Sequence, residues 1–231
     1  IVEICKEEKL PYFVLGNGSN LLVSDRGYRG VVIQLWKNFS DITVKDCCIQ
    51  AKAGALLSKV AAEALEAGLT GMEFASGIPG TIGGAAFMNA GAYGGEMKDI
   101  IKSVKVLDTQ GEARVLPKEE LKMGYRTSIV KEKGYTVLSV ELELTRGNQE
   151  EIRNTMEDLK ERRTSKQPLE MPSAGSTFKR PEGYFAGKLV DDAGLRGYRV
   201  GNVMVSEKHC GFVVNVGGGT CEEAKAVITH V

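Results

Sequence analysis

The chain has 231 residues, of which 42% are hydrophobic and 26% are charged. This composition predicts one large or two small globular domains and excludes disordered and fibrous proteins. Its 30 Lys and Arg residues equal its 30 Asp and Glu residues in number, so no overall positive field attracts nucleic acid or an anionic membrane. Recognition of a phosphate must therefore be local, and the clustered positions among the 28 glycines are the first candidates.

The five cysteines are odd in number, and none forms the C-x-x-C spacing of a zinc or redox site. His209 lies beside Cys210 without further ligands at metal spacing, so we expect no metal site. The sequence has no run of 18 apolar residues and no export signal. We therefore expect a cytoplasmic protein with neither a nucleic acid nor a membrane as its partner.

The first two thirds of the chain are dominated by short strands. Ile1, Ile4 and Cys5 have helical spacing and predict the second half of a helix. An amphipathic helix is predicted from Leu56 to Ala67, with Gly68 as its end. Strands are predicted over residues 12–15, 30–35, 42–44, 49–53, 103–107 and 135–144.

The sequence changes character near Arg146–Gly147, which predicts a boundary between domains 1–147 and 148–231. Thr220 and Glu223 form a capping box that begins a last helix. Before it we expect a helix over 148–164, a loop over 173–181, a helix over 185–193 and strands over 203–205 and 211–216. The fold class is α+β. Because neither terminal helix is capped at the chain end, we expect the sequence to be the interior of a longer protein.

The first glycine cluster is Gly16-Asn17-Gly18-Ser19-Asn20, between an apolar strand and a second strand expected over Leu21–Val23. It is not the dinucleotide fingerprint G-x-G-x-x-G, because Leu21 occupies the third glycine position. The two glycines are compatible with a nest of main-chain N–H groups for a phosphate. They are equally compatible with a plain hairpin turn.

The second cluster, between Gly77 and Gly95, contains seven glycines. So many positions without a side chain favour a cradle for a bound dinucleotide, because each glycine costs conformational entropy. A close contact between a helix and a sheet is the alternative explanation for Gly83 and Gly84. No Gly-Lys-Ser or Gly-Lys-Thr follows, so the segment is not a Walker A loop.

Two single residues have chemistry of interest. Arg126, after Gly124 and Tyr125, is suited to clamp a carboxylate, although a solvated or ion-paired arginine fits the same local sequence. Ser176 lies among small residues and is a candidate proton donor, although a polar loop fits as well. Ser176 is outside a G-x-S-x-G elbow, which disfavours a serine hydrolase. His209 fits a buried structural role or a substrate contact.

Together, in this order, four segments resemble the UDP-N-acetylenolpyruvylglucosamine reductase (MurB) family. They are Gly16 to Leu22, Gly77 to Glu96, Tyr125 to Ser128 and Ala174 to Pro181. The runs from Phe185 to Val190 and from Ser206 to Phe212 are similar to the shorter, second type of that enzyme. The resemblance covers essentially the whole chain.

The resemblance implies an FAD-binding domain of the PCMH or vanillyl-alcohol-oxidase type, followed by a smaller α+β substrate-binding domain. It implies an FAD- and NADPH-dependent oxidoreductase, UDP-N-acetylmuramate dehydrogenase, that reduces UDP-N-acetylglucosamine enolpyruvate to UDP-N-acetylmuramate. This reaction belongs to peptidoglycan precursor synthesis, and hence to cell wall biogenesis, cell shape and cell division. The implied partner is a small molecule, the enolpyruvyl ether of a UDP-sugar.

By the same resemblance, Arg126 stabilises the charge that develops at the substrate carboxylate, and Ser176 donates the proton. Tyr125, Lys179, Arg180 and His209 are candidates for contact with the UDP moiety or the carboxylate. The residues matched to FAD contacts are Gly16, Asn17, Gly18, Ser19, Asn20, Gly77, Gly80, Thr81, Gly83, Gly84, Asn89, Gly91 and Val137.

Some parts of the family pattern have no counterpart in this sequence. The catalytic glutamate of the family follows the last helix, so no residue up to Val231 is assigned that role. Two other functions stay open: an oxygen-using FAD oxidase of the same fold, and a catalytically silent module that binds nucleotide sugars. The oxidase is disfavoured because residues 71–100 contain no His or Cys to tether a flavin. The sequence does not indicate an oligomeric state.

Overall fold

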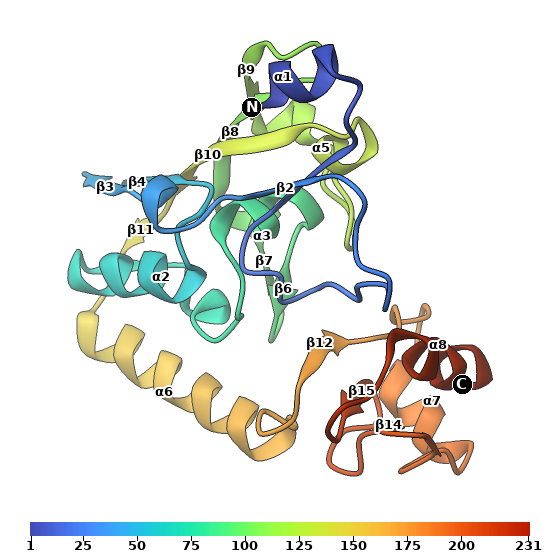
Figure 1. Ribbon diagram of the computed structural model, residues 1–231. Helices are drawn as coiled ribbons and strands as arrows, with labels where there is room; N and C mark the ends of the chain where they lie inside the picture. Colours follow the sequence, from blue (N-terminus) through green and yellow to red (C-terminus); the bar gives the residue numbers. More distant parts are fainter. The chain divides into compact units, whose positions relative to one another are not determined.

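A computed structural model describes every residue from Ile1 to Val231, and the chain divides into two compact units (Figure 1). Unit 1 contains Ile1–Gly18 and Gly30–Lys160, and unit 2 contains Ser19–Arg29 and Glu161–Val231. Each unit has its own hydrophobic core. The domain boundary predicted near residue 147 falls just before helix α6 (Gln149–Lys166), and the division of the units lies within that helix.

Unit 1 is built on a five-stranded antiparallel sheet in the order β3-β4-β10-β8-β9. Apolar residues alternate along its central strands, and the inward ones, such as Val104, Val140 and Leu142, are fully buried. The strands are β3 (Ile42–Lys45), β4 (Cys48–Lys52), β8 (Ile101–Leu107), β9 (Ala113–Pro117) and β10 (Thr136–Glu143). All except β9 were expected from the sequence.

Two helices of unit 1 bury apolar residues in the same core as the sheet: α2 (Leu57–Glu66) and α3 (Ile82–Met88). Helix α3 approaches the sheet so closely that a Cβ atom on Gly83 would lie 2.7 Å from the Cβ of Ala53. The helix–sheet contact considered for Gly83 is therefore correct. Helix α3 begins at Thr81, whose Oγ1 accepts a hydrogen bond from the Gly84 amide at 3.4 Å.

The remaining elements of unit 1 are short. Strand β1 (Tyr12–Leu15) pairs in parallel with β2 (Val31–Gln34). The helices are α1 (Val2–Glu7), α4 (Met97–Ile100) and α5 (Ile129–Glu132), with 3₁₀ turns at Lys37–Phe39, Glu73–Ala75 and Lys118–Leu121. The two-residue strands are β5 (Leu69–Thr70), β6 (Gly91–Ala92), β7 (Gly95–Glu96) and β11 (Thr145–Arg146).

The strand predicted over Leu21–Val23 is wrong. These three residues have no regular structure, and their side chains are 37 to 57% exposed. The partner of β1 is β2, in parallel, so no antiparallel strand follows the glycine turn. Instead Leu21–Val23 lies in the Ser19–Arg29 segment, which belongs to unit 2. Leu21–Val23 is an apolar run, but it does not form a strand because no neighbouring strand pairs with it.

Unit 2 contains a four-stranded antiparallel sheet in the order β12-β15-β14-β13 and two helices. Buried apolar residues of β14 and β15, including Val205 and Val213, pack with Val227 of the last helix. The elements are β12 (Ser173–Ser176), α7 (Ala186–Asp192), β13 (Arg199–Val200), β14 (Val203–Val205), β15 (Phe212–Asn215) and α8 (Cys221–His230). The predicted helices and the strands at 203–205 and 211–216 are confirmed within a few residues.

The loop predicted over 173–181 is wrong in its first part, because Ser173–Ser176 forms strand β12. Four small residues carry no strong β-propensity, and the strand is defined instead by its pairing with β15. The register shifts between Ser173 and Ser176, where Gly175 adopts φ +84°. A positive φ at this point is accessible because the residue is glycine.

The first turn of helix α8 is capped by side chains from two segments of unit 2 that are distant in sequence. Asp25 accepts hydrogen bonds from the amides of Cys221 at 2.7 Å and Glu222 at 3.1 Å. Thr220 Oγ1 accepts from the amide of Glu223 at 3.1 Å, and the Glu223 carboxylate accepts from the amide of Thr220, which confirms the capping box. The N–H groups that a helix start leaves unpaired are thus satisfied.

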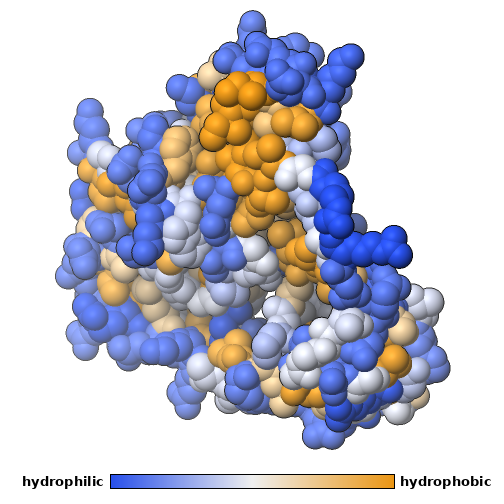
Figure 2. Space-filling model, viewed as in Figure 1, coloured by the Kyte–Doolittle hydropathy of each residue, from blue (hydrophilic) through white to orange (hydrophobic).

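The surface of the molecule is uneven in polarity (Figure 2). Helix α6 presents a mainly hydrophilic surface at the lower left of the view, and Ile152 is the residue it buries. An apolar area is visible in the upper part of the view. Among the exposed apolar residues of unit 1 are Phe13 and Val32 of the β1–β2 pair, which are 41% and 50% exposed. No helix in either unit is long and apolar enough for a membrane crossing.

Candidate active site

The two glycine clusters meet in unit 1. A Cβ atom on Gly16 would lie 2.2 Å from Thr81 Oγ1, so this contact requires glycine. Asn17 Nδ2 donates a hydrogen bond to the Pro79 carbonyl at 2.8 Å. Segments 62 residues apart are therefore in direct contact. The hairpin interpretation of the first cluster is wrong, because the strand that pairs with β1 is β2, which runs parallel to it.

Several main-chain positions in these clusters are open. Gly18, at φ +69°, is exposed, as are Gly77 and Gly84. A Cβ atom on Gly84 would meet only Thr81 Oγ1, at 3.6 Å, and one on Gly94 would meet no atom within 4 Å. Exposed glycines let a ligand approach main-chain N–H groups closely. The open main chain at these positions is compatible with the predicted dinucleotide cradle.

Asn89 ends helix α3 in the left-handed conformation, with φ 47°, and is completely buried. Its Nδ2 donates to the Gly124 carbonyl at 2.9 Å and to Glu96 Oε2 at 3.2 Å. Its Oδ1 accepts from the amide of Lys98 at 2.9 Å. The side chain predicted to contact the cofactor thus makes its hydrogen bonds within the protein.

Arg126 is half-buried at the tip of a tight turn in which Gly124 and Thr127 exchange two main-chain hydrogen bonds. Its Nη1 donates to the Asn89 carbonyl at 3.2 Å, and its Nη2 donates to the Gly91 carbonyl at 2.9 Å. These neutral acceptors orient the guanidinium without cancelling its charge. Two of its five N–H donors are used in this way, which leaves donors for a carboxylate.

The ring of Tyr125 lies beside Arg126, with the guanidinium carbon 5.0 Å from the ring centroid. Tyr125 itself is 46% exposed. Val137, also predicted to contact the cofactor, is buried in the core of unit 1 on strand β10. Its side chain packs among apolar residues, so only its main chain is available for other contacts.

The carboxylate of Glu96 places a negative charge near Arg126. The Lys98 ammonium, 2.7 Å from Glu96 Oε2, holds the pKa of this carboxyl below its usual value. The Asn89 amide and the charge of Arg126 lower the pKa further, against an opposing effect of burial. Glu96 is therefore ionised at neutral pH. Sequence reasoning did not select Glu96, and its position in a capping box with Asp99 was the available local signal.

In unit 2, Ser176 is exposed at the end of β12, opposite Phe212 on β15. The next residue fixes this strand end: the Thr177 amide donates to the Gly211 carbonyl at 2.9 Å, and Thr177 Oγ1 accepts from the Val213 amide at 3.2 Å. The Ser176 hydroxyl is thus carried by a paired strand end and is open to a ligand.

His209 lies in the same part of unit 2. Its Nδ1 accepts a hydrogen bond from the Gly211 amide at 3.0 Å, and its ring packs edge-on against Phe212 at 5.0 Å between centroids. A neutral imidazole that accepts at Nδ1 carries its proton on Nε2. His209 therefore presents an N–H donor on its other side. Gly187 leaves room for the ring, because a Cβ atom there would lie 3.3 Å from His209 Cε1.

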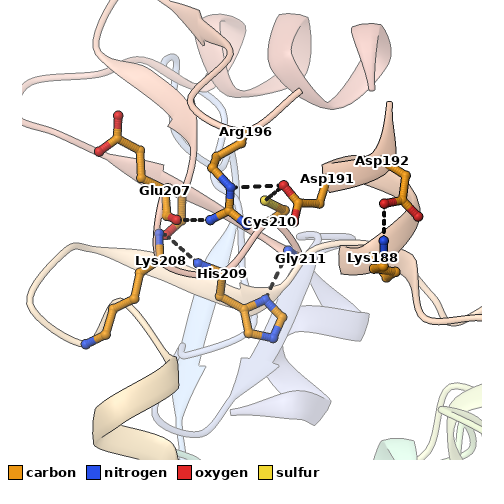
Figure 3. A network of polar contacts seen from close by, with 10 residues as sticks. Lys188, Asp191, Asp192, Arg196, Glu207, Lys208, His209, Cys210 and Gly211 are labelled. Carbon is orange, nitrogen blue, oxygen red and sulfur yellow. Dashed lines mark hydrogen bonds and ion pairs between the residues drawn. The ribbon is translucent and has the colours of Figure 1, made fainter. Parts of the chain in front are cut away.

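A largely exposed polar network holds the turn that carries His209 (Figure 3). Arg196 donates to both oxygens of Asp191, at 2.9 and 2.7 Å, and also to the Glu207 carbonyl. The Cys210 thiol, 3.6 Å from Asp191 Oδ1, is a further donor. Arg196 holds the pKa of Asp191 below its usual value, and burial raises the pKa of Cys210. The network ties Glu207 to Gly211 onto the loop after α7.

The two cations that follow Ser176 are exposed. The Arg180 guanidinium lies over the Phe185 ring, 4.6 Å from its centroid. Of the predicted site residues, Gly16–Gly18 and those from Gly77 to Val137 belong to unit 1. Ser19, Asn20 and those from Ser176 to His209 belong to unit 2.

Two family models match the chain. Residues 1–116 match the model described as an FAD binding domain. Residues 167–231 match the model described as the C-terminal domain of UDP-N-acetylenolpyruvoylglucosamine reductase. Both halves of the expected α+β architecture are thereby confirmed.

Curated relatives agree with these models. UDP-N-acetylenolpyruvoylglucosamine reductases of Clostridium perfringens (strain SM101 / Type A) and Alkaliphilus oremlandii are 56% and 54% identical to this chain. The matches cover 100% and 98% of the chain and 75% of each relative. The reductase of Clostridioides difficile is 54% identical over 96% of the chain and 73% of that protein.

A solved structure has the same fold. The crystal structure of UDP-N-acetylenolpyruvylglucosamine reductase from Thermus caldophilus superimposes with a TM-score of 0.88 at 40% identity. The match covers 99% of this chain and 83% of that protein.

Proposed function

The chain belongs to the UDP-N-acetylenolpyruvoylglucosamine reductase family, and from this membership we propose a role for each site residue. Members of this family are FAD-dependent oxidoreductases of peptidoglycan precursor synthesis. With NADPH as reductant, they convert UDP-N-acetylglucosamine enolpyruvate to UDP-N-acetylmuramate. The relatives are named as reductases, which disfavours the oxidase and the silent binding module.

The glycine cradle of unit 1 is proposed to hold FAD. Bound there, FAD would supply the hydride chemistry that links NADPH to the enolpyruvyl double bond. Gly18 and Gly84 offer exposed main chain for the diphosphate, and the missing side chain at Gly94 leaves space for a flat ring. The fit supports these positions over Asn89 and Val137, whose side chains are buried.

Arg126 is proposed to bind the substrate carboxylate. Hydride addition at the β-carbon places negative charge on the α-carbon and its carboxylate, and a fixed cation stabilises this charge. The observation that carries the proposal is the pair of hydrogen bonds from the guanidinium to the Asn89 and Gly91 carbonyls. They orient the group before substrate arrives, so no reorganisation is needed during the reaction.

Ser176 is proposed to give its proton to the α-carbon. An alcohol is a weak acid, and it can protonate a carbon that carries strong negative charge. The exposed hydroxyl at the end of β12 is accessible for this step. His209, through Nε2–H, together with Lys179 and Arg180, is proposed to bind the diphosphate or carboxylate of the substrate.

We also propose a cytoplasmic location, because NADPH and UDP-sugars are metabolites of that compartment. The five cysteines are all free thiols, which agrees with a reducing environment.

Anaerobic stopped-flow absorbance tests the proposed function. The flavin-loaded protein is mixed first with NADPH and then with the enolpyruvyl substrate. We expect the flavin band to bleach and then to recover when substrate is added. Bleaching that recovers only on admission of oxygen would indicate an oxidase, and binding of the UDP-sugar without any bleaching would indicate a silent module.

A further inference from the structure

We infer that Asn89 is a positioning residue that acts through Arg126 and touches neither cofactor nor substrate with its side chain. The inference rests on the proposed role of Arg126 in binding the substrate carboxylate. It departs from the expectation that Asn89 is a cofactor contact.

The first argument is the hydrogen-bonding capacity of the Asn89 amide. An asparagine side chain offers two N–H donors and one carbonyl acceptor. Both donors are used, by Gly124 and Glu96, and the acceptor is used by the amide of Lys98. With a side chain that is 0% exposed, no donor remains for a ligand.

The second argument is the pair of contacts that Asn89 makes with the Arg126 turn. Its side chain holds the Gly124 carbonyl at 2.9 Å, and its own main-chain carbonyl accepts from Arg126 Nη1 at 3.2 Å. One residue thus fixes both the base of the turn and the guanidinium at its tip. Its partners lie 35 and 37 residues away, so this clamp is a tertiary feature.

The third argument is backbone conformation. Asn89 at φ 47° and Arg126 at φ 57° are both left-handed. Asparagine tolerates this region, whereas a long side chain such as arginine rarely enters it. Such a conformation persists when surrounding contacts over-determine it. The hydrogen bonds that Asn89 makes with Gly124 and Arg126 are among these contacts, and we expect the turn to relax from the left-handed state when the side-chain bond is lost.

The consequence for the reaction is specific. A displaced guanidinium stabilises the developing charge less well, and small misplacements of a catalytic group are costly. Loss of the Asn89 side chain should therefore slow reoxidation of the flavin by substrate about tenfold to a hundredfold. Reduction by NADPH does not involve the substrate carboxylate, and its rate should change less than about twofold.

Asn89→Gly is the informative variant, because glycine keeps the left-handed conformation and removes only the side chain. Asn89→Ala also removes the side chain but adds backbone strain, so the difference between the two variants measures the effect of strain. The matched control is Thr70→Val, which removes the part-buried 2.6 Å hydrogen bond to Glu73 elsewhere in unit 1. We expect both changes to lower Tm, but only Asn89→Gly to slow reoxidation. If reoxidation slows equally in the two variants, Asn89 is merely structural and the inference is overturned.

A double-mutant cycle tests whether Asn89 acts through Arg126. Arg126→Met should slow reoxidation by itself, and adding Asn89→Gly should then slow it little further. Additive effects would overturn the inference while leaving the role of Arg126 intact. An unchanged rate in Arg126→Met would instead contradict the proposed function, so the two failures are distinguishable.

Nuclear magnetic resonance supplies a readout that needs no turnover. The two Nη nitrogens of an arginine give separate ¹⁵N signals when hydrogen bonds restrict its rotation. We expect resolved signals for Arg126, assigned by their loss in Arg126→Met, and their averaging into one in Asn89→Gly. Resolved signals that persist in Asn89→Gly would show that other contacts orient the guanidinium, and would overturn the inference.

Discussion

The two units hold the side chains proposed to act on the substrate in opposite ways. In unit 1 the Arg126 guanidinium donates hydrogen bonds to the main-chain carbonyls of Asn89 and Gly91. The fully buried side chain of Asn89 supports the turn that carries Arg126. In unit 2 the Ser176 hydroxyl stands on an exposed strand end of small residues, beside a glycine at positive φ. A cation must be oriented to bind a planar carboxylate, whereas a hydroxyl can rotate into place. We therefore expect changes around Arg126 to affect stability and rate together, and changes around Ser176 to affect rate alone.

Ser176→Ala should give the largest effect. A positioned proton donor contributes about 10²- to 10⁴-fold, so flavin reoxidation by substrate should slow by that factor. Flavin reduction by NADPH and Tm should stay near the unmodified values, because the hydroxyl is exposed. Stopped-flow absorbance of each half-reaction measures this. Ser173→Ala, in the same exposed strand, is the control. A comparable loss in the NADPH step would refute the role of Ser176.

Arg126→Met should come next. Removal of one group that stabilises developing negative charge costs about 10²- to 10³-fold, and here the loss should appear in reoxidation. Arg126→Lys keeps the charge but loses the planar fork, so it should recover only part of the rate. Unlike Ser176→Ala, both variants should lower Tm, because two carbonyls lose their donors. Full activity in the lysine variant would mean that charge alone, without orientation, is sufficient.

Asp25→Ala should have a moderate effect on unit 2. Loss of a helix cap costs about 1 kcal/mol, and Asp25 accepts from two amides of α8. Urea unfolding followed by circular dichroism measures the change. Asp25→Asn retains one carbonyl acceptor and should lose less. Asp41→Asn, an exposed aspartate of unit 1, is the control for a change in net charge. Equal stability of the Asp25 and Asp41 variants would contradict the capping role.

The smallest expected effect is the pH dependence that Glu96 contributes to unit 1. Its pKa is lower in the folded chain than in the unfolded one, chiefly through Lys98. Its stabilisation is therefore complete above the unfolded pKa of about 4.3 and is lost as pH falls through the lower folded value. The contribution should be below about 1 kcal/mol, because the pair is partly exposed. Glu96→Gln should make the free energy of unfolding depend less on pH between about pH 5 and about pH 3. An unchanged dependence on pH in this variant would exclude the Glu96 carboxyl as its source.

Strong local patterns made much of the fold predictable. The amphipathic helix at α2, the capping box of α8 and the alternating strands β8 and β10 follow from spacing alone. Gly83 was also explained correctly, because a glycine at a helix–sheet contact has few alternatives.

Pairing and long-range contacts were not predictable. The strand expected at Leu21–Val23 does not form, and Ser173–Ser176 pairs as a strand despite weak propensity, since each outcome depends on the neighbouring edge. In the candidate site, the family motifs identified Arg126 and Ser176, whose roles stay predictions. The internal use of the Asn89 amide depends on Gly124, which is distant in sequence, and no local pattern encodes it.

The cap that Asp25 provides to α8 has a consequence for the order of folding. Asp25 lies 196 residues before Cys221, so this contact cannot form until α8 has been synthesised. Contacts of such sequence separation form slowly, because the loop entropy must be lost first. Residues 1–18 and 30–160 of unit 1 are synthesised before α8, when Ser19–Arg29 still lacks this partner. The Ser19–Arg29 segment thus reaches its final packing only after α8 has been synthesised.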